Sequence, residues 1–86
     1  MDLYAVYLGG DLAGDRMGED HEVVFVAGSD LAEVRRRARA KWSGAGRAHV
    51  DAVRRIEVVD GYEIALREVG GADRTWLDRT FDPGDD

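Results

Sequence analysis

Residues 23–44, VVFVAGSDLAEVRRRARAKWSG, carry the strand-to-helix transition that decides the fold. Residues 23–27 are mostly β-branched or aromatic, which is typical of a strand, and Gly28 stops that strand. Asp30 predicts a helix N-cap, and Glu33 three residues later completes the pattern of a capping box. Gly44 is a natural stop for this helix.

The predicted helix is amphipathic. Its apolar residues fall on one stripe at helical spacing: Leu31, Val34, Ala38 and Trp42. The rest of its surface is basic: Arg35, Arg36, Arg37, Arg39 and Lys41. We therefore expect the helix to cover one face of a sheet.

Strands are predicted on both sides of this unit. Residues 3–8 form a first strand that Gly9 and Gly10 end, and residues 50–58 and 62–69 form a hairpin. A three-residue loop, 59–61, would pair Val58 with Tyr62 and so match apolar side chains. The fold class is α+β: β-β-α-β-β, a four-stranded mainly antiparallel sheet with one helix on one face and a possible extra C-terminal strand.

Length and composition bound the organisation and the partners. The 86 residues predict one domain over 1–72 and a partly ordered tail over 73–86 with an acidic end. The absence of cysteine excludes disulfides and thiolate metal sites, and the net charge of −6 disfavours nucleic acid. No signal peptide or membrane span is apparent, so we expect a cytoplasmic protein without a membrane partner.

The first two predicted strands are apolar on both faces, which is typical of strands covered on both sides. One helix covers only one face, so either the tail or a second copy of the chain must cover the other. We expect a homodimer through the second sheet face. The tail offers Trp76, Leu77 and Phe81 as further candidate contacts.

Both histidines have an acid two residues away, in Glu19-x-His21 and His49-x-Asp51. A spacing of two puts both side chains on one face of a strand. Where the two strands lie close, two imidazoles and two carboxylates would converge, a set that suits a divalent metal or a proton-transfer pair. The alternative is a structural hydrogen-bond network at the strand ends.

The arginine run is a second candidate site. Arg35 and Arg39 are candidate ligands for a phosphate or RNA, although Glu33 is placed to pair with Arg37 and much of the run is typical of a solvated face. The sequence contains no P-loop, nucleophile elbow or dinucleotide fingerprint. We therefore assign no catalytic residue and no metal ligand, and expect no cofactor.

Five short motifs occur in one order: Tyr7-Leu-Gly-Gly10, Glu19-x-His21-Glu22-Val-x-Phe25-Val-x-Gly28, Lys41-Trp42-x-Gly44, His49-x-Asp51 and Asp60-Gly61-Tyr62. Over residues 1–68 the chain resembles the bacterial family catalogued as domain of unknown function 1543. The resemblance implies a small β-β-α-β-β domain that also occurs as tandem copies. It implies no activity, but it includes the positions of Glu19, His21, His49 and Asp51.

The chain departs from the family pattern at two positions. The resemblance implies aspartate where Glu22 stands and a bulky residue where Ser43 stands, which weakens the case for Glu22 as a functional residue. The leading hypothesis is a non-catalytic dimerising interaction or ligand-binding module. The first alternative is a small enzyme or metal-binding protein that uses the Glu-x-His and His-x-Asp cluster, and the second is anion or RNA binding by the helix.

Overall fold

The structure is a computed structural model that describes residues 1–11 and 18–80, so the acidic end of the predicted tail lies outside the described residues. The elements follow the chain in this order: β1 (Asp2–Asp11), β2 (Asp20–Gly28), α1 (Leu31–Ala40), β3 (Ala45–Ile56), β4 (Val58–Val59) and β5 (Tyr62–Glu63). The α+β class is confirmed. No helix in the described ranges is long and apolar enough to cross a membrane.

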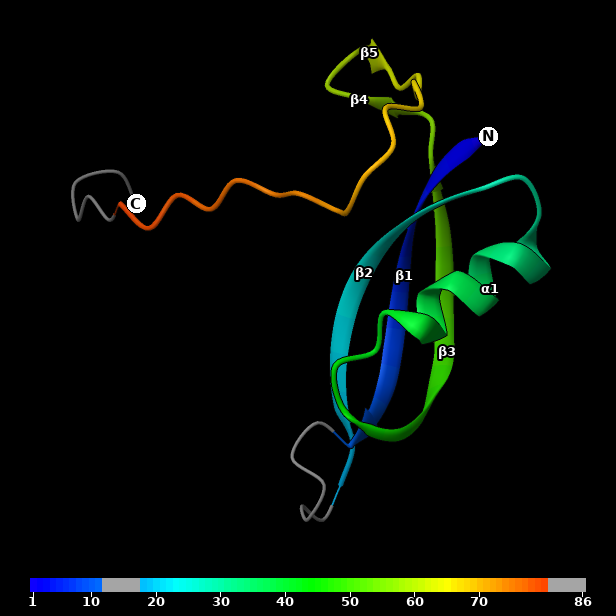
Figure 1. Ribbon diagram of the computed structural model, residues 1–86, viewed down its shortest axis with the longest axis vertical. Coiled ribbons are helices and arrows are strands. Elements are labelled where there is room, and N and C mark those ends of the chain that lie inside the picture. The colour runs from blue at the N-terminus through cyan, green and yellow to red at the C-terminus, as the bar shows by residue number, and fades with distance from the viewer. Residues whose placement is uncertain (12–17, 81–86) are drawn as a thin grey trace.

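The main sheet has three strands in the order β2-β1-β3, and β1 is antiparallel to both neighbours. Consequently β2 and β3 run in the same direction, and α1 connects them across one face of the sheet (Figure 1). The predicted fourth strand does not join this sheet. Instead β4 and β5 form a separate two-stranded sheet, and residues 64–80 contain no strand.

Helix α1 begins as the sequence predicts. The side chain of Asp30 accepts a hydrogen bond of 2.8 Å from the backbone N–H of Glu33, which satisfies one of the free amides of the first turn. The side chain of Glu33 pairs with Arg37 at 3.4 Å, on the next turn of the helix. The helix ends at Ala40, earlier than the predicted stop at Gly44, and Lys41 is its C-cap.

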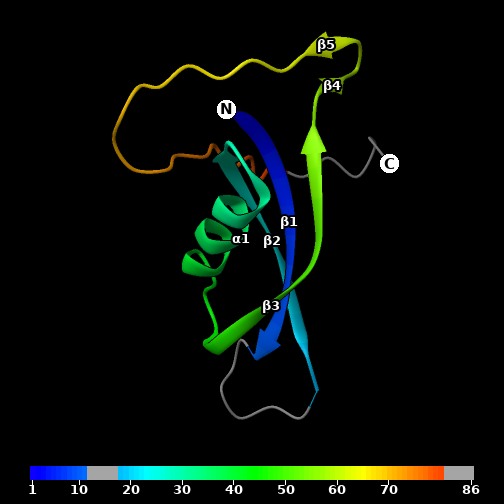
Figure 2. The ribbon, with the colours of Figure 1, turned by 90° about the vertical axis from the view of Figure 1, so that its right-hand side faces the viewer.

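The core lies between α1 and one face of the sheet. Its buried residues are Tyr4, Val6, Leu8, Val26, Val34, Ala38 and Ala48. Tyr4, Val6 and Leu8 alternate along β1, so the intervening side chains of β1 point to the opposite face. Within residues 1–11 and 18–80, no element covers that opposite face (Figure 2), which we call the open face. It is formed by β1, β2 and β3.

The predicted three-residue hairpin loop is wrong. Val59 pairs with Tyr62 across a two-residue turn in which Asp60 and Gly61 both have positive φ, 54° and 83°. These angles match a type I′ turn, which Asp-Gly favours. The prediction assumed that the hairpin buries one apolar face, but Val58 is 62% exposed, so burial does not set the register.

The segment after β5 is extended and crosses the outer edge of β2. Asp73 pairs there with Lys41 at 2.8 Å, and Lys41 also donates a hydrogen bond of 2.6 Å to the backbone oxygen of Phe25. Beyond this point the chain leads away from the body of the protein (Figure 1). Trp76 is 85% exposed and Leu77 is also exposed, while Phe81 lies outside the described residues.

Candidate functional site

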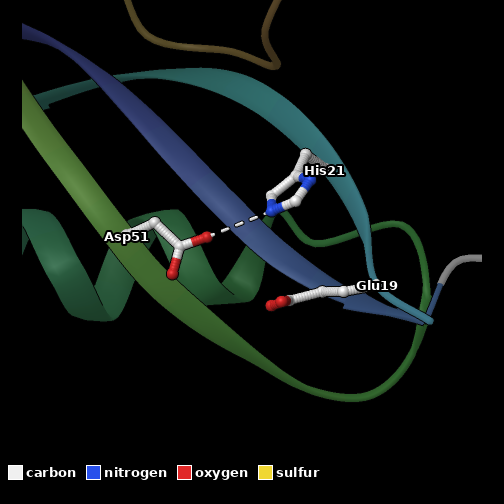
Figure 3. A group of neighbouring side chains, drawn as sticks. All are labelled: Glu19, His21 and Asp51. Carbon is white, nitrogen blue, oxygen red and sulfur yellow. Dashed lines mark ion pairs between the residues drawn. The ribbon is translucent and has the colours of Figure 1, made fainter.

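Three of the four predicted site residues come together on the open face. Glu19 lies just before β2, His21 lies on β2 and Asp51 lies on β3 (Figure 3). One ligand atom from each lies within 4.8 Å of the other two. The imidazole Nε2 of His21 is 3.4 Å from Oδ2 of Asp51. We call these three residues the acid–histidine cluster.

Gly9 makes this convergence possible. Strand β1 separates β2 from β3, so the two outer strands lie about 10 Å apart, twice the usual spacing between neighbours. The cluster side chains bridge that distance above Gly9, where β1 has no side chain. A Cβ atom at Gly9 would lie 2.6 Å from Oδ2 of Asp51 and would also contact Oε1 of Glu19. The space above Gly9 is therefore filled by the two carboxylates.

A β-bulge in β3 is the second feature that lets the three side chains converge. Tyr7 pairs with Ala52 and the next residue, Leu8, pairs with Val50, so Asp51 is an extra residue on β3. In a regular strand Asp51 would point to the helix side, because its neighbour Ala52 points to the open face. The bulge places its carboxylate on the open face instead. The same bulge lets Val50 pack against the core.

Tyr7 fixes the plane of the histidine ring. The rings of Tyr7 and His21 stack with centroids 4.8 Å apart and an interplanar angle of 2°. Such a contact limits rotation of the imidazole and holds Nε2 toward Asp51. The side chains of His21 and Asp51 are 36% and 37% exposed, so the cluster is open to solvent and to a small ligand.

His49 is not part of the cluster. It pairs with Gly9 across β1 and β3 and lines a shallow hollow with Arg39 and Arg47. The sequence spacing correctly grouped Glu19, His21 and Asp51, but it also placed His49 with them, and the ligand atoms that converge do not include one from His49. Gly9 and Tyr7 were missed as site residues. The sequence predicted that Gly9 ends the first strand, whereas β1 continues through it to Asp11, and a glycine within a strand often marks close approach of other groups.

The remaining candidates lie elsewhere. Glu22 is on the helix side of the sheet, where its carboxylate accepts hydrogen bonds from the Ser43 N–H at 3.0 Å and the Ser43 hydroxyl at 2.6 Å. It therefore anchors the loop after α1. Arg35 and Arg39 are exposed on α1, outside the cluster.

Chemically, the cluster offers two carboxylate oxygens and one imidazole nitrogen. When the carboxylates are ionised and the imidazole is neutral, the set carries two negative charges and matches a divalent cation. Nitrogen and oxygen ligands of these types suit zinc and neighbouring transition metals. Three protein ligands leave at least one coordination position free.

The fold and site define a small α+β domain with a three-residue polar cluster on an uncovered sheet face. The chain matches the family model described as Domain of Unknown Function (DUF1543) over residues 16–66, more than half of its length, and it belongs to that family. The match includes all three cluster residues, whereas Gly9 and Tyr7 lie before it. Neither the curated proteins nor the solved structures gave a match.

Proposed function

We propose that this protein binds a divalent transition-metal ion, best matched by zinc, through Glu19, His21 and Asp51. The observation that carries the proposal is the convergence of these three side chains above Gly9. His21 and Asp51 come from two strands that are not neighbours, and Glu19 lies just before the first of them, so their meeting requires both the glycine and the bulge.

The distances fit such an ion. Zinc–ligand bonds of about 2.0–2.1 Å place two ligands of a tetrahedral site about 3.3–3.4 Å apart. His21 Nε2 and Asp51 Oδ2 already have this separation, at 3.4 Å. The largest separation in the cluster, at most 4.8 Å, closes by rotation of exposed carboxylates. An imidazole ligand favours zinc over magnesium and calcium, which prefer oxygen.

Calorimetric titration of the full chain with zinc tests the proposal. We expect one zinc site per chain and much weaker binding of magnesium. Changes to groups that only orient a ligand reduce metal affinity by about 10- to 100-fold, so loss of a ligand in His21→Ala should cost at least about 10-fold.

His49→Ala is the matched control, because it removes the other histidine and leaves the cluster intact. Its zinc affinity should equal that of the wild type. The proposal is wrong if the wild type binds no zinc, or if both histidine variants lose affinity equally.

A further inference from the structure

We infer that the open face is the interface of a symmetric homodimer, in which two copies pack face to face with their strands antiparallel. The inference rests on the apolar residues of the face and on its charges, and because Glu19 and Asp51 also belong to the metal proposal, it is tested without metal. The occupant of the face is a second copy of this chain.

The open face is apolar at its centre, and no described residue of the chain covers it. Val23 and Phe25 on β2 are 54% and 56% exposed, and Tyr7 on β1 is exposed beside them. Ala5, Tyr7, Val23 and Ala52 line a shallow hollow there, together with Arg54. Contiguous exposed apolar residues of this kind mark interaction surfaces, and sheets commonly pack face to face at small angles.

The charges at the two ends of the face identify a second copy as the partner. Asp51 and Glu19 lie at the Gly9 end of β1, whereas Arg54 pairs with Ala5 nearer the other end. In the described part of the chain Arg54 has no ion pair. The acidic end therefore complements the basic end of an identical face.

A two-fold axis that lies between the two copies, perpendicular to the strands and level with Tyr7, would form this contact between the acidic and basic ends twice. Tyr7 pairs with Ala52, midway between the acidic end and Arg54. Rotation about this axis reverses the strands and sets Arg54 of one copy opposite Asp51 of the other. The same contact recurs at the symmetric position, as an isologous interface requires.

The size of the face predicts moderate affinity. Seven residues on each of three strands cover about 23 Å by about 14 Å, an area of about 320 Å². This area is smaller than the about 800 Å² that each partner buries in a standard interface. We therefore expect a dissociation constant in the micromolar range. The test must accordingly span this range.

Sedimentation of the full chain in EDTA between about 1 and about 200 μM tests the inference without any metal. We expect the mass of two chains at the high end and dissociation on dilution. Val23→Asp places a charge at the centre of the face and should weaken the dimer at least about 10-fold. Val58→Asp is the matched control in the hairpin and should leave the dimer intact.

Three further variants test the geometry and the competing occupant. Arg54→Asp should weaken the dimer, and the double variant Asp51→Arg, Arg54→Asp should restore it. A wild type that is monomeric throughout overturns the inference, as does equal loss in Val23→Asp and Val58→Asp. If the wild type is monomeric but the double variant Trp76→Ser, Leu77→Ser associates, the tail of the same chain covers the face.

Discussion

Gly9 and Gly10 are consecutive residues of β1 that leave space on opposite faces of the sheet. A Cβ at Gly9 would meet the exposed carboxylates of Glu19 and Asp51, which can rotate away. A Cβ at Gly10 would lie 2.7 Å from the ring of Trp42, and this ring cannot rotate away because it packs against the core. The first glycine therefore makes room for a site and the second for the core.

These contacts predict opposite effects for two neighbouring substitutions. Gly9→Ala should keep the free energy of unfolding or raise it by about 0.5–1 kcal/mol, since alanine suits a strand better. It should nevertheless reduce zinc affinity at least about 10-fold. Gly10→Ala should lower the free energy of unfolding by about 1–3 kcal/mol, because the ring must shift.

Urea unfolding and zinc titration of both variants check this prediction. Gly10→Ala is the control for the effect of an added methyl group in β1. Unchanged zinc affinity in Gly9→Ala would show that the cluster does not need the space above Gly9.

Glu22 and Ser43, the two positions where the chain differs from the pattern that the resemblance implies, meet in the structure. Glu22 accepts two hydrogen bonds from Ser43. A glutamate, longer than the expected aspartate, thus contacts a serine, smaller than the expected bulky residue. The sequence showed each departure separately, but their contact depends on how the loop after α1 returns to β2. The bulge at Asp51 was equally hidden, because a bulge changes no residue type and leaves the alternation readable in two ways.

Helix α1 does more than cover the core, since its basic side chains also satisfy the outer edge of β2. Arg37 donates a hydrogen bond of 2.7 Å to the backbone oxygen of Ala27, and Lys41 donates one to that of Phe25. Unpaired backbone groups on an edge strand invite pairing with another chain. Part of the arginine-rich run thus protects this edge from pairing with another strand.

Lys41 also fixes the segment after β5. Its hydrogen bond and its positive charge lower the pKa of the Asp73 carboxyl, which should therefore titrate below the ordinary value of about 3.9. Because the folded pKa is the lower one, this contact stabilises the docked segment above the ordinary pKa. The stabilisation is lost as the pH falls through the folded value.

Carboxyl NMR titration of Lys41→Met checks this prediction. The pKa of Asp73 should return to the ordinary value. Asp78 is the internal control, because the backbone N–H of Thr80 lowers its pKa and Lys41 plays no part. An unchanged Asp73 titration would show that the segment does not dock on β2 through Lys41.

Elements with strong local signals were predictable. The N-cap at Asp30 and the apolar stripe fixed α1, and the run before Gly28 fixed β2. The register of the hairpin was not predictable, because its side chains are exposed and backbone angles at Asp60 and Gly61 set that register. Strand order was also hidden, since pairing between distant segments leaves no local pattern.

At the scale of the whole molecule, the protein has two faces of different character. One is closed by α1 over a small core, and the other carries the acid–histidine cluster beside an apolar centre. The sequence indicated two apolar faces and one helix, and from this the uncovered face could be foreseen. What covers this face could not be foreseen from the sequence, because the arrangement of charges on which the dimer proposal depends follows from the strand order β2-β1-β3.

The proposed metal site uses His21, one of the two histidines of the chain. Long-range ¹H–¹⁵N NMR of the imidazole rings, recorded during zinc addition, tests it most directly because two rings are easily distinguished. We expect one equivalent of zinc to shift the Nε2 signal of His21 and to leave His49 unchanged. Shifts at His49, or at neither ring, would show that zinc does not bind at the acid–histidine cluster as proposed.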